Sequence, residues 1–155
     1  MKNTTEIKDI DFRVVNEDWS YFKLKDGTIL KVRSNIVKIV KVGVEPSTGY
    51  PKYDIEFRNA VAAKVPKELM KEPSGKPVAI EPRDIKPEEF DMEFNAPEDI
   101  KIKRENWQKY ELEDGYDLYV KPHVLKVIRT KKYNKYGEPI YIVNVQLLMN
   151  AKKRS

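Results

Sequence analysis

The chain has 155 residues, of which 40% are hydrophobic and 35% charged, and its formal net charge is +5. This length suits one ordinary domain or two very small ones. The chain has no cysteine, which excludes disulfides, thiolate metal sites and cysteine nucleophiles, and no stretch approaches the ~20 apolar residues of a membrane helix. We therefore expect a cytoplasmic location without membrane association. Many Lys and Glu residues with only two Gln also match the composition of heat-adapted proteins.

A constant offset of 88 residues aligns residues 12–64 with residues 100–152 without a gap. Thirteen of the 53 aligned positions are identical and span three turn regions, so the sequence predicts a tandem duplication of one β-rich unit. The predicted order is an N-terminal extension (1–11), β repeat 1 (12–64), a proline-rich acidic connector (65–99), β repeat 2 (100–152) and a basic tail (153–155). We expect the repeats to be related by pseudo-two-fold symmetry.

Each repeat is predicted to begin with a short strand, near Phe12–Val15 in the first copy, followed by a hairpin. Apolar and polar residues alternate on both sides of Asp26-Gly27, which is a strong hairpin signal. The repeated apolar positions are all even, so they share one face only if the loop holds an odd number of residues. A three-residue loop, Lys25-Asp26-Gly27, meets this condition and gives Gly27 the left-handed conformation. Asp114-Gly115 predicts the same loop in the second copy.

The next strand, Ile36–Val42, has apolar residues at both even-numbered and odd-numbered positions, and so does its copy, Val124–Thr130. This pattern predicts a strand covered on both faces, which would be the contact between the copies. After a loop with Gly49, a last strand runs through Tyr53–Phe57. The predicted fold class is all-β, with about five strands per repeat, the scale of an SH3-like barrel. Separate barrels and one shared barrel both remain open.

The connector holds six of the ten prolines and carries 5 basic and 10 acidic residues. Pro66–Met70 and Pro87–Phe90 are each predicted to form one helical turn, and the rest to be extended. The acidic run Glu88–Glu93 is interpreted as a solvated face.

Both repeats are basic: residues 12–64 carry 10 basic and 6 acidic groups, and residues 100–155 carry 13 and 6. The densest basic segment, residues 129–137, is placed in a loop between strands. It interleaves cations with tyrosines, as nucleic-acid binding requires, because cations neutralise phosphates and aromatic rings stack on bases. The matching loop of the first copy, residues 43–50, is not basic, so a solvated loop is the alternative. The candidate nucleic-acid-binding residues are Arg129, Lys131, Lys132, Tyr133, Lys135 and Tyr136.

No catalytic, cofactor or metal site is predicted. His123 and Asn35 occupy matching slots and are interpreted as polar bend residues at strand starts. Asp26 and Asp114 adjoin a hairpin glycine, which explains them without catalysis. Trp19 and Trp107 are interpreted as core side chains.

The sequence thus predicts a non-enzymatic binding module that uses basic β surfaces on DNA or RNA. The alternative is a protein-interaction or assembly subunit that binds a protein partner. The oligomeric state is not predicted.

Overall fold

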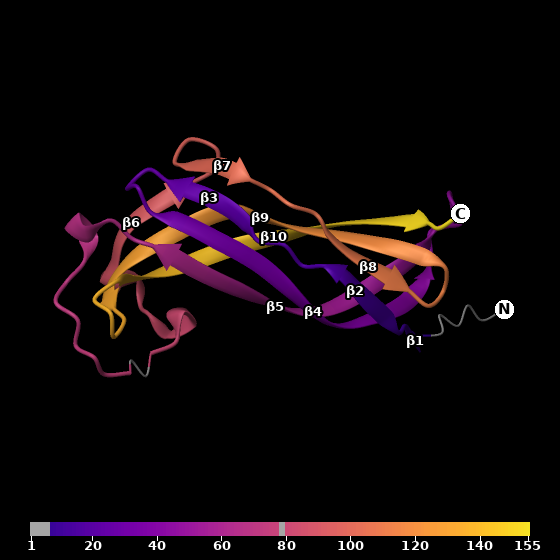
Figure 1. Ribbon diagram of the computed structural model, residues 1–155, viewed down its shortest axis with the longest axis horizontal. Helices are drawn as coiled ribbons and strands as arrows, with labels where there is room; N and C mark the ends of the chain where they lie inside the picture. The colour runs from indigo at the N-terminus through magenta and orange to yellow at the C-terminus, as the bar shows by residue number, and fades with distance from the viewer. Residues whose placement is uncertain (1–6, 78–79) are drawn as a thin grey trace.

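A computed structural model describes residues 7–77 and 80–155 of the chain, so residues 1–6 of the predicted N-terminal extension lie outside the described residues. The all-β class is confirmed: the described residues form two five-stranded sheets, A and B. No helix in these ranges is long and apolar enough to cross a membrane. Long strands run along most of the molecule (Figure 1). The strands are β1 (Lys8–Asp9), β2 (Phe12–Asn16), β3 (Ser20–Leu24), β4 (Ile29–Val44), β5 (Pro51–Lys64), β6 (Phe90–Asn95), β7 (Ile100–Arg104), β8 (Gln108–Leu112), β9 (Tyr116–Tyr133) and β10 (Pro139–Lys153).

Each sheet contains one strand that is distant in sequence from its neighbours. Sheet A has the order β1-β4-β3-β7, with β5 on the other side of β4. Sheet B has the order β10-β9-β8-β2, with β6 also paired to β9. Strand β7 therefore adds to the first hairpin and β2 to the second (Figure 1). Because of this exchange, neither residues 12–64 nor residues 100–152 close a barrel separately.

The hairpins β3–β4 and β8–β9 have the predicted three-residue loops. Phe22 pairs with Leu30, and both are fully buried, as the argument from parity requires. Gly27 and Gly115 have φ angles of 93° and 91°, which side chains with a Cβ rarely adopt. The loop prediction is confirmed for both hairpins.

The prediction that residues 36–42 are covered on both faces is wrong. Val37 is 57% exposed and its counterpart in β9, Leu125, is 40% exposed. Each is the extra residue of a β-bulge, because Ile36 and Lys38 pair with adjacent residues of β5 and Val124 and Lys126 with adjacent residues of β10. A bulge reverses the parity of the residues that follow it, so Ile36 and Ile39 both point inward. The bulge accounts for apolar residues at both parities.

Two hydrophobic cores lie toward opposite ends of the molecule (Figure 1). In the first core, Phe22 and Leu30 of sheet A pack with Val124 and Val127 of β9. In the second, Tyr110 and Leu118 of sheet B pack with Ile36 and Ile39 of β4. Each core thus takes side chains from both residue ranges, and separating the two ranges would expose both cores to water.

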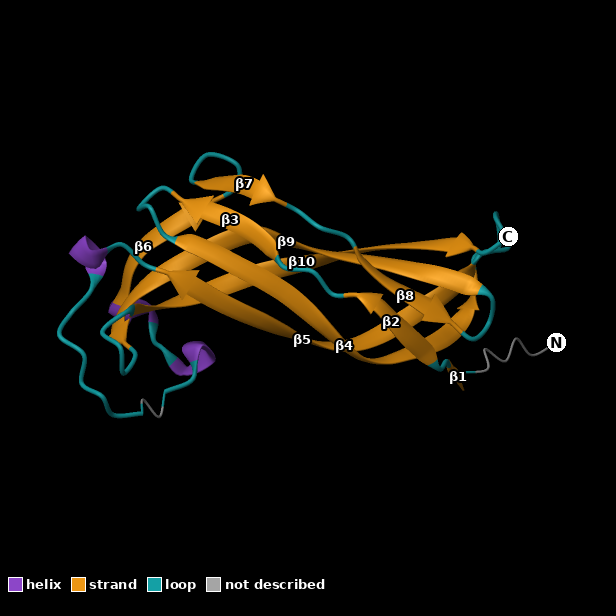
Figure 2. Ribbon diagram, viewed as in Figure 1, coloured by secondary structure: helices purple, strands orange, loops and turns teal. Residues whose placement is uncertain are grey.

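Less of the connector is irregular extended chain than the sequence predicted. Lys67–Leu69, Pro82–Asp84 and Pro87–Glu89 form single 3₁₀ turns, two of them within the predicted helical turns (Figure 2). Residues 90–95 form β6, which pairs with β9. The acidic run is solvent-exposed over most of its length, as interpreted, and its carboxylates also form ion pairs: Glu89 and Glu93 with lysines of β9 and Asp91 with Arg129.

Candidate nucleic-acid interface

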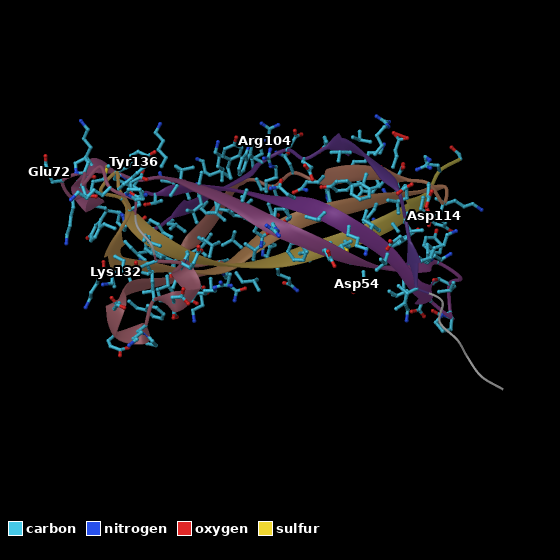
Figure 3. All side chains as sticks on the ribbon, turned by 90° about the horizontal axis from the view of Figure 1, so that it is seen from below. Asp54, Glu72, Arg104, Asp114, Lys132 and Tyr136 are labelled. Carbon is cyan, nitrogen blue, oxygen red and sulfur yellow. The ribbon has the colours of Figure 1, made fainter. Side chains whose placement is uncertain are left out.

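The predicted binding segment is mostly strand. The loop prediction for residues 129–137 is wrong for its first five residues, because β9 extends to Tyr133 and only residues 134–138 turn toward β10. Lys132 and Tyr136 lie together at one end of the molecule, far along its long axis from Asp114 (Figure 3). The candidate residues follow one another along the end of β9 and the turn after it, and several of them contact other side chains of the protein.

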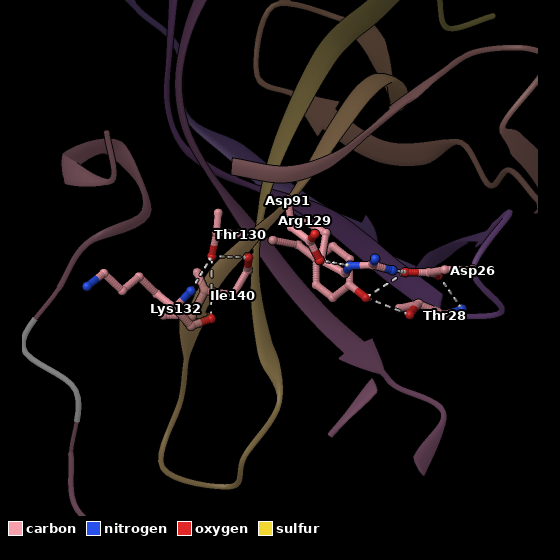
Figure 4. Close-up of polar contacts among 8 residues, drawn as sticks. Asp26, Thr28, Asp91, Arg129, Thr130, Lys132 and Ile140 are labelled. Atoms are coloured by element: carbon pink, nitrogen blue, oxygen red, sulfur yellow. Dashed lines mark hydrogen bonds and ion pairs between the residues drawn. The ribbon is translucent and has the colours of Figure 1, made fainter. Parts of the chain in front are cut away.

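Arg129 is held between two carboxylates. Its Nη1 lies 3.0 Å from Asp26 Oδ2 and its Nε 2.9 Å from Asp91 Oδ2, and its side chain is only 13% exposed (Figure 4). Burial acts to lower the pKa of the Arg129 guanidinium, but the hydrogen bonds to Asp91 and Asp26 outweigh it and raise that pKa. Arg129 is therefore a structural cation that is not free to bind a phosphate.

Four further candidates also contact other side chains of the protein. Lys132 Nζ lies 2.7 Å from Glu89 Oε2. The ring of Tyr133 is covered by Lys71 Nζ at 4.3 Å, and Lys135 Nζ lies 5.1 Å from the centre of the Tyr136 ring. Lys131 is exposed, as are Lys135 and Tyr136. Within residues 7–77 and 80–155, these last three are exposed and have no carboxylate partner.

A larger group of cations without carboxylate partners in the described residues lies on the outer face of sheet A. On this face, opposite the buried Phe22 and Leu30, cross-strand rows join Lys64, Ile29, Lys23 and Lys101 in one line and Ala62, Lys31, Tyr21 and Arg104 in the next. Arg33 and Arg58 extend the same face. We call this surface the basic face; its cations are Lys23, Lys31, Arg33, Arg58, Lys64, Lys101 and Arg104.

None of these seven cations forms an ion pair with a carboxylate within residues 7–77 and 80–155. The guanidinium Nε of Arg33 is buried and has no hydrogen-bond partner in the described part of the chain. Arg104 projects from the middle of the molecule, well away from Lys132 and Tyr136 (Figure 3). Arg104 of the basic face thus lies apart from Lys132 and Tyr136 of the predicted segment, whereas Ala62 of that face and Asn134 of the segment line one depression.

The two tryptophans lie on the sheet surfaces, so their interpretation as core side chains is wrong. Trp19 is half-buried, with Lys31 Nζ at 4.5 Å and the Arg33 guanidinium at 4.4 Å from its ring centre. Trp107 is 42% exposed, with Lys121 Nζ at 4.7 Å. Such cation–π contacts hold the cations in place without neutralising them. The alternation of residues 19–24 placed Trp19 on the face opposite Phe22, and this signal could have identified it as a surface residue.

The outer face of sheet B carries carboxylates among its cations. Lys109 Nζ lies 3.8 Å from Asp117, and Arg154 Nη1 lies 2.7 Å from the same carboxylate. Lys121 Nζ lies 3.4 Å from Glu105. Arg13 of β2 also pairs with Glu111 of β8. Most cations of this face thus have an internal counter-charge.

The remaining polar candidates have structural roles. His123 lies inside β9 and Asn35 inside β4, so the prediction that they begin strands is wrong; His123 Nδ1 lies 2.6 Å from Glu105 Oε2. Asp26 accepts hydrogen bonds from Thr28 N and the Tyr141 hydroxyl as well as Arg129, and Asp114 accepts one from the Tyr53 hydroxyl. No group of three or more His, Cys, Asp or Glu side chains suited to a metal ion occurs among residues 7–77 and 80–155.

Comparison of the chain with protein-family models, curated proteins and solved structures gave no match.

Proposed function

We propose that this protein is a non-enzymatic nucleic-acid-binding module that binds DNA or RNA through the basic face of sheet A. The observation that carries the proposal is a set of seven cations on one sheet face, none paired with a carboxylate in the described residues, around Trp19 and Tyr21. Free lysines and arginines bind phosphates by releasing counterions, and aromatic rings add stacking on bases. The proposal includes the cytoplasmic location expected from the sequence.

The proposal moves the interface away from the segment that the sequence favoured. In that segment Arg129 and Lys132 are neutralised by Asp91 and Glu89 of the connector. A phosphate that approached them would have to displace a carboxylate or meet its repulsion. In the described part of the chain no carboxylate pairs with a cation of the basic face, so a phosphate need not displace one there.

The test is a comparison of two double charge reversals. Lys23→Glu/Arg104→Glu changes two exposed residues of the basic face, and Lys131→Glu/Lys135→Glu makes the same change of charge at the segment. We expect the first variant to bind a labelled oligonucleotide at least tenfold more weakly at low salt and to flatten the dependence of affinity on salt, because each phosphate contact contributes to that slope. The second variant is expected to stay within about twofold of the unaltered protein.

Absence of any binding at low salt would refute nucleic-acid binding. A larger loss in the Lys131→Glu/Lys135→Glu variant would return the interface to the segment. Circular dichroism of both variants controls for folding.

We also propose that the two sheets derive from one duplicated unit with pseudo-two-fold symmetry. Reciprocal registers support this: Phe12 pairs with Leu112, and Ile100 pairs with Leu24, positions that differ by 88 in both members. The bulged residues Val37 and Leu125 differ by the same number.

Side-chain contacts add to this support. The Tyr53 hydroxyl donates to Asp114, and the Tyr141 hydroxyl donates to Asp26, again with an offset of 88. Burial and these carboxylates raise the pKa of both tyrosines, so both hydroxyls remain donors. An experimental structure in which residues 12–64 and 100–152 fail to superimpose at this offset would contradict the duplication.

Protein interaction is the second candidate function, and the outer edges of β5 and β10 favour it. Each of these long strands hydrogen-bonds to one neighbouring strand within the described residues, and part of the edge of β10 contacts η2 and β5. An open edge can accept a strand of another protein. This function predicts co-purifying partners that persist at high salt, whereas nucleic-acid binding is lost there.

A further inference from the structure

A shallow depression lies within the basic face, between β3, β4 and β5. Its volume is about 290 Å³, and it is lined by Tyr21, Ile29, Lys31, Ala62, Ala63 and Lys64. It exists because β5 presents the small side chain of Ala62 beside the long side chain of Lys31, its cross-strand partner. Tyr21 borders the same row on β3. We call this depression the Tyr21 trough.

The trough has an apolar floor and a cationic rim. Ile29, Ala62 and Ala63 contribute aliphatic side chains and Tyr21 an aromatic one, whereas Lys31 and Lys64 contribute long cationic side chains; Lys31 Nζ lies 4.5 Å from the centre of the Trp19 ring. A phosphate alone would gain little from such a floor, since it would lose water without hydrogen bonds in return. The surface suits a flat aromatic group with a negative charge beside it.

We infer that the Tyr21 trough binds the base of an unpaired nucleotide, so that the module prefers single-stranded nucleic acid to duplex. This inference rests on the proposed function and narrows its ligand class. A base can lie on Tyr21 only when its own face is free, and in a duplex both faces of each base are covered by neighbouring pairs. The exposed cations Lys23 and Lys64, on either side of the trough, hold the adjacent phosphates.

The spacing of the aromatic side chains favours an extended strand. Trp19 directly precedes β3 and Tyr21 is the second residue of that strand, so two residues of chain, at most about 7 Å, separate them. This is about twice the 3.4 Å rise per base of one strand in B-form DNA. Two successive bases can reach both rings only if the strand is unstacked and stretched, which a duplex does not allow.

The experiment measures binding of a single-stranded oligonucleotide of about 12 nucleotides, of a duplex with the same sequence and of a nucleoside monophosphate, each at low salt. Tyr21→Leu is compared with Tyr119→Leu, a matched change on the outer face of sheet B, where Lys109 and Lys152 lie near the ring. We expect the single strand to bind at least tenfold tighter than the duplex. Tyr21→Leu should weaken single-strand binding about tenfold and leave duplex binding unchanged, because stacking on one ring has that magnitude. Tyr119→Leu should change neither.

A second measurement follows binding at Trp19, whose ring contacts Lys31 of the trough. In a Trp107→Phe variant, Trp19 is the only tryptophan, and we expect a bound single strand to quench its fluorescence. Equal affinity for single strand and duplex, unchanged by Tyr21→Leu, would overturn the inference while leaving the proposed function standing. Absence of binding by both would overturn both. A nucleoside monophosphate that binds as tightly as the oligonucleotide would show that the trough takes a free nucleotide, and would also overturn the inference.

Discussion

The outer faces of sheets A and B have the same strand arrangement but differ in how their cations are paired with carboxylates. On sheet A, Lys23 and Ile29 are neighbours across β3 and β4, and no carboxylate pairs with a cation of this face in the described residues. On sheet B the corresponding neighbours across β8 and β9 are Glu111 and Asp117, which pair with surrounding cations. The comparison teaches that a few side chains on one scaffold decide whether a sheet face can attract an anion.

The difference changes the electrostatic potential at the surface. Among the ion pairs of sheet B, Arg13–Glu111 is largely exposed and such a pair contributes only about 0–1 kcal/mol to folding, whereas the pairs of Asp117 and Glu105 are partly buried. They do reduce the positive potential that a polyanion would meet. The unpaired cations of sheet A repel each other, and a ligand with several phosphates would relieve that repulsion.

The two hairpin aspartates give the largest expected effect. Asp26→Ala would leave the 13% exposed Arg129 without one of its two carboxylates, whereas Asp114→Ala removes the acceptor of the Tyr53 hydroxyl. We expect the first change to lower the free energy of unfolding by about 3 kcal/mol and the second by about 1 kcal/mol, because an under-compensated buried charge costs more than a lost neutral hydrogen bond. Urea denaturation measures both. Equal losses would show that the two hairpins are energetically equivalent.

The two surface tryptophans test whether the faces differ in binding. Trp19→Leu removes the ring that orders Lys31 and Arg33, and Trp107→Leu removes the ring beside Lys121. Fluorescence anisotropy with a labelled single strand should show about fivefold weaker binding for the first variant, from lost stacking and cation–π ordering, and no change for the second. A loss confined to Trp107→Leu would assign binding to sheet B.

The smallest expected effect comes from making sheet B resemble sheet A. Glu111→Lys removes the partner of Arg13 and places a lysine where sheet A has Lys23. We expect about a twofold to threefold gain in affinity for an oligonucleotide and a steeper dependence of that affinity on salt. Titrations at two or more salt concentrations measure both quantities. If affinity does not rise, the charge of sheet B has no part in binding.

Short-range patterns in the sequence were sufficient to predict the hairpins. Alternation around Asp26-Gly27 gave the register of Phe22 with Leu30, since only an odd loop puts both on one face. The same alternation was misinterpreted for Ile36–Val42, because one bulged residue, Val37, mimics a strand buried on both faces. The sequence contains the cations of sheet A but does not show that they share one face, because Arg104 reaches that face only through the pairing of β7 with β3.

The sequence alone determined the all-β class, the loop lengths and the left-handed glycines, because these depend on residues that are near neighbours in the chain. The tertiary structure decided which sheet receives β2 and β7, and that Asp91 and Glu89 neutralise Arg129 and Lys132. These pairings join residues about 40 or more positions apart, and nothing in local alternation or charge specifies a partner at that distance. The location of the unpaired cations, on which the proposed binding rests, was therefore a property of the folded protein.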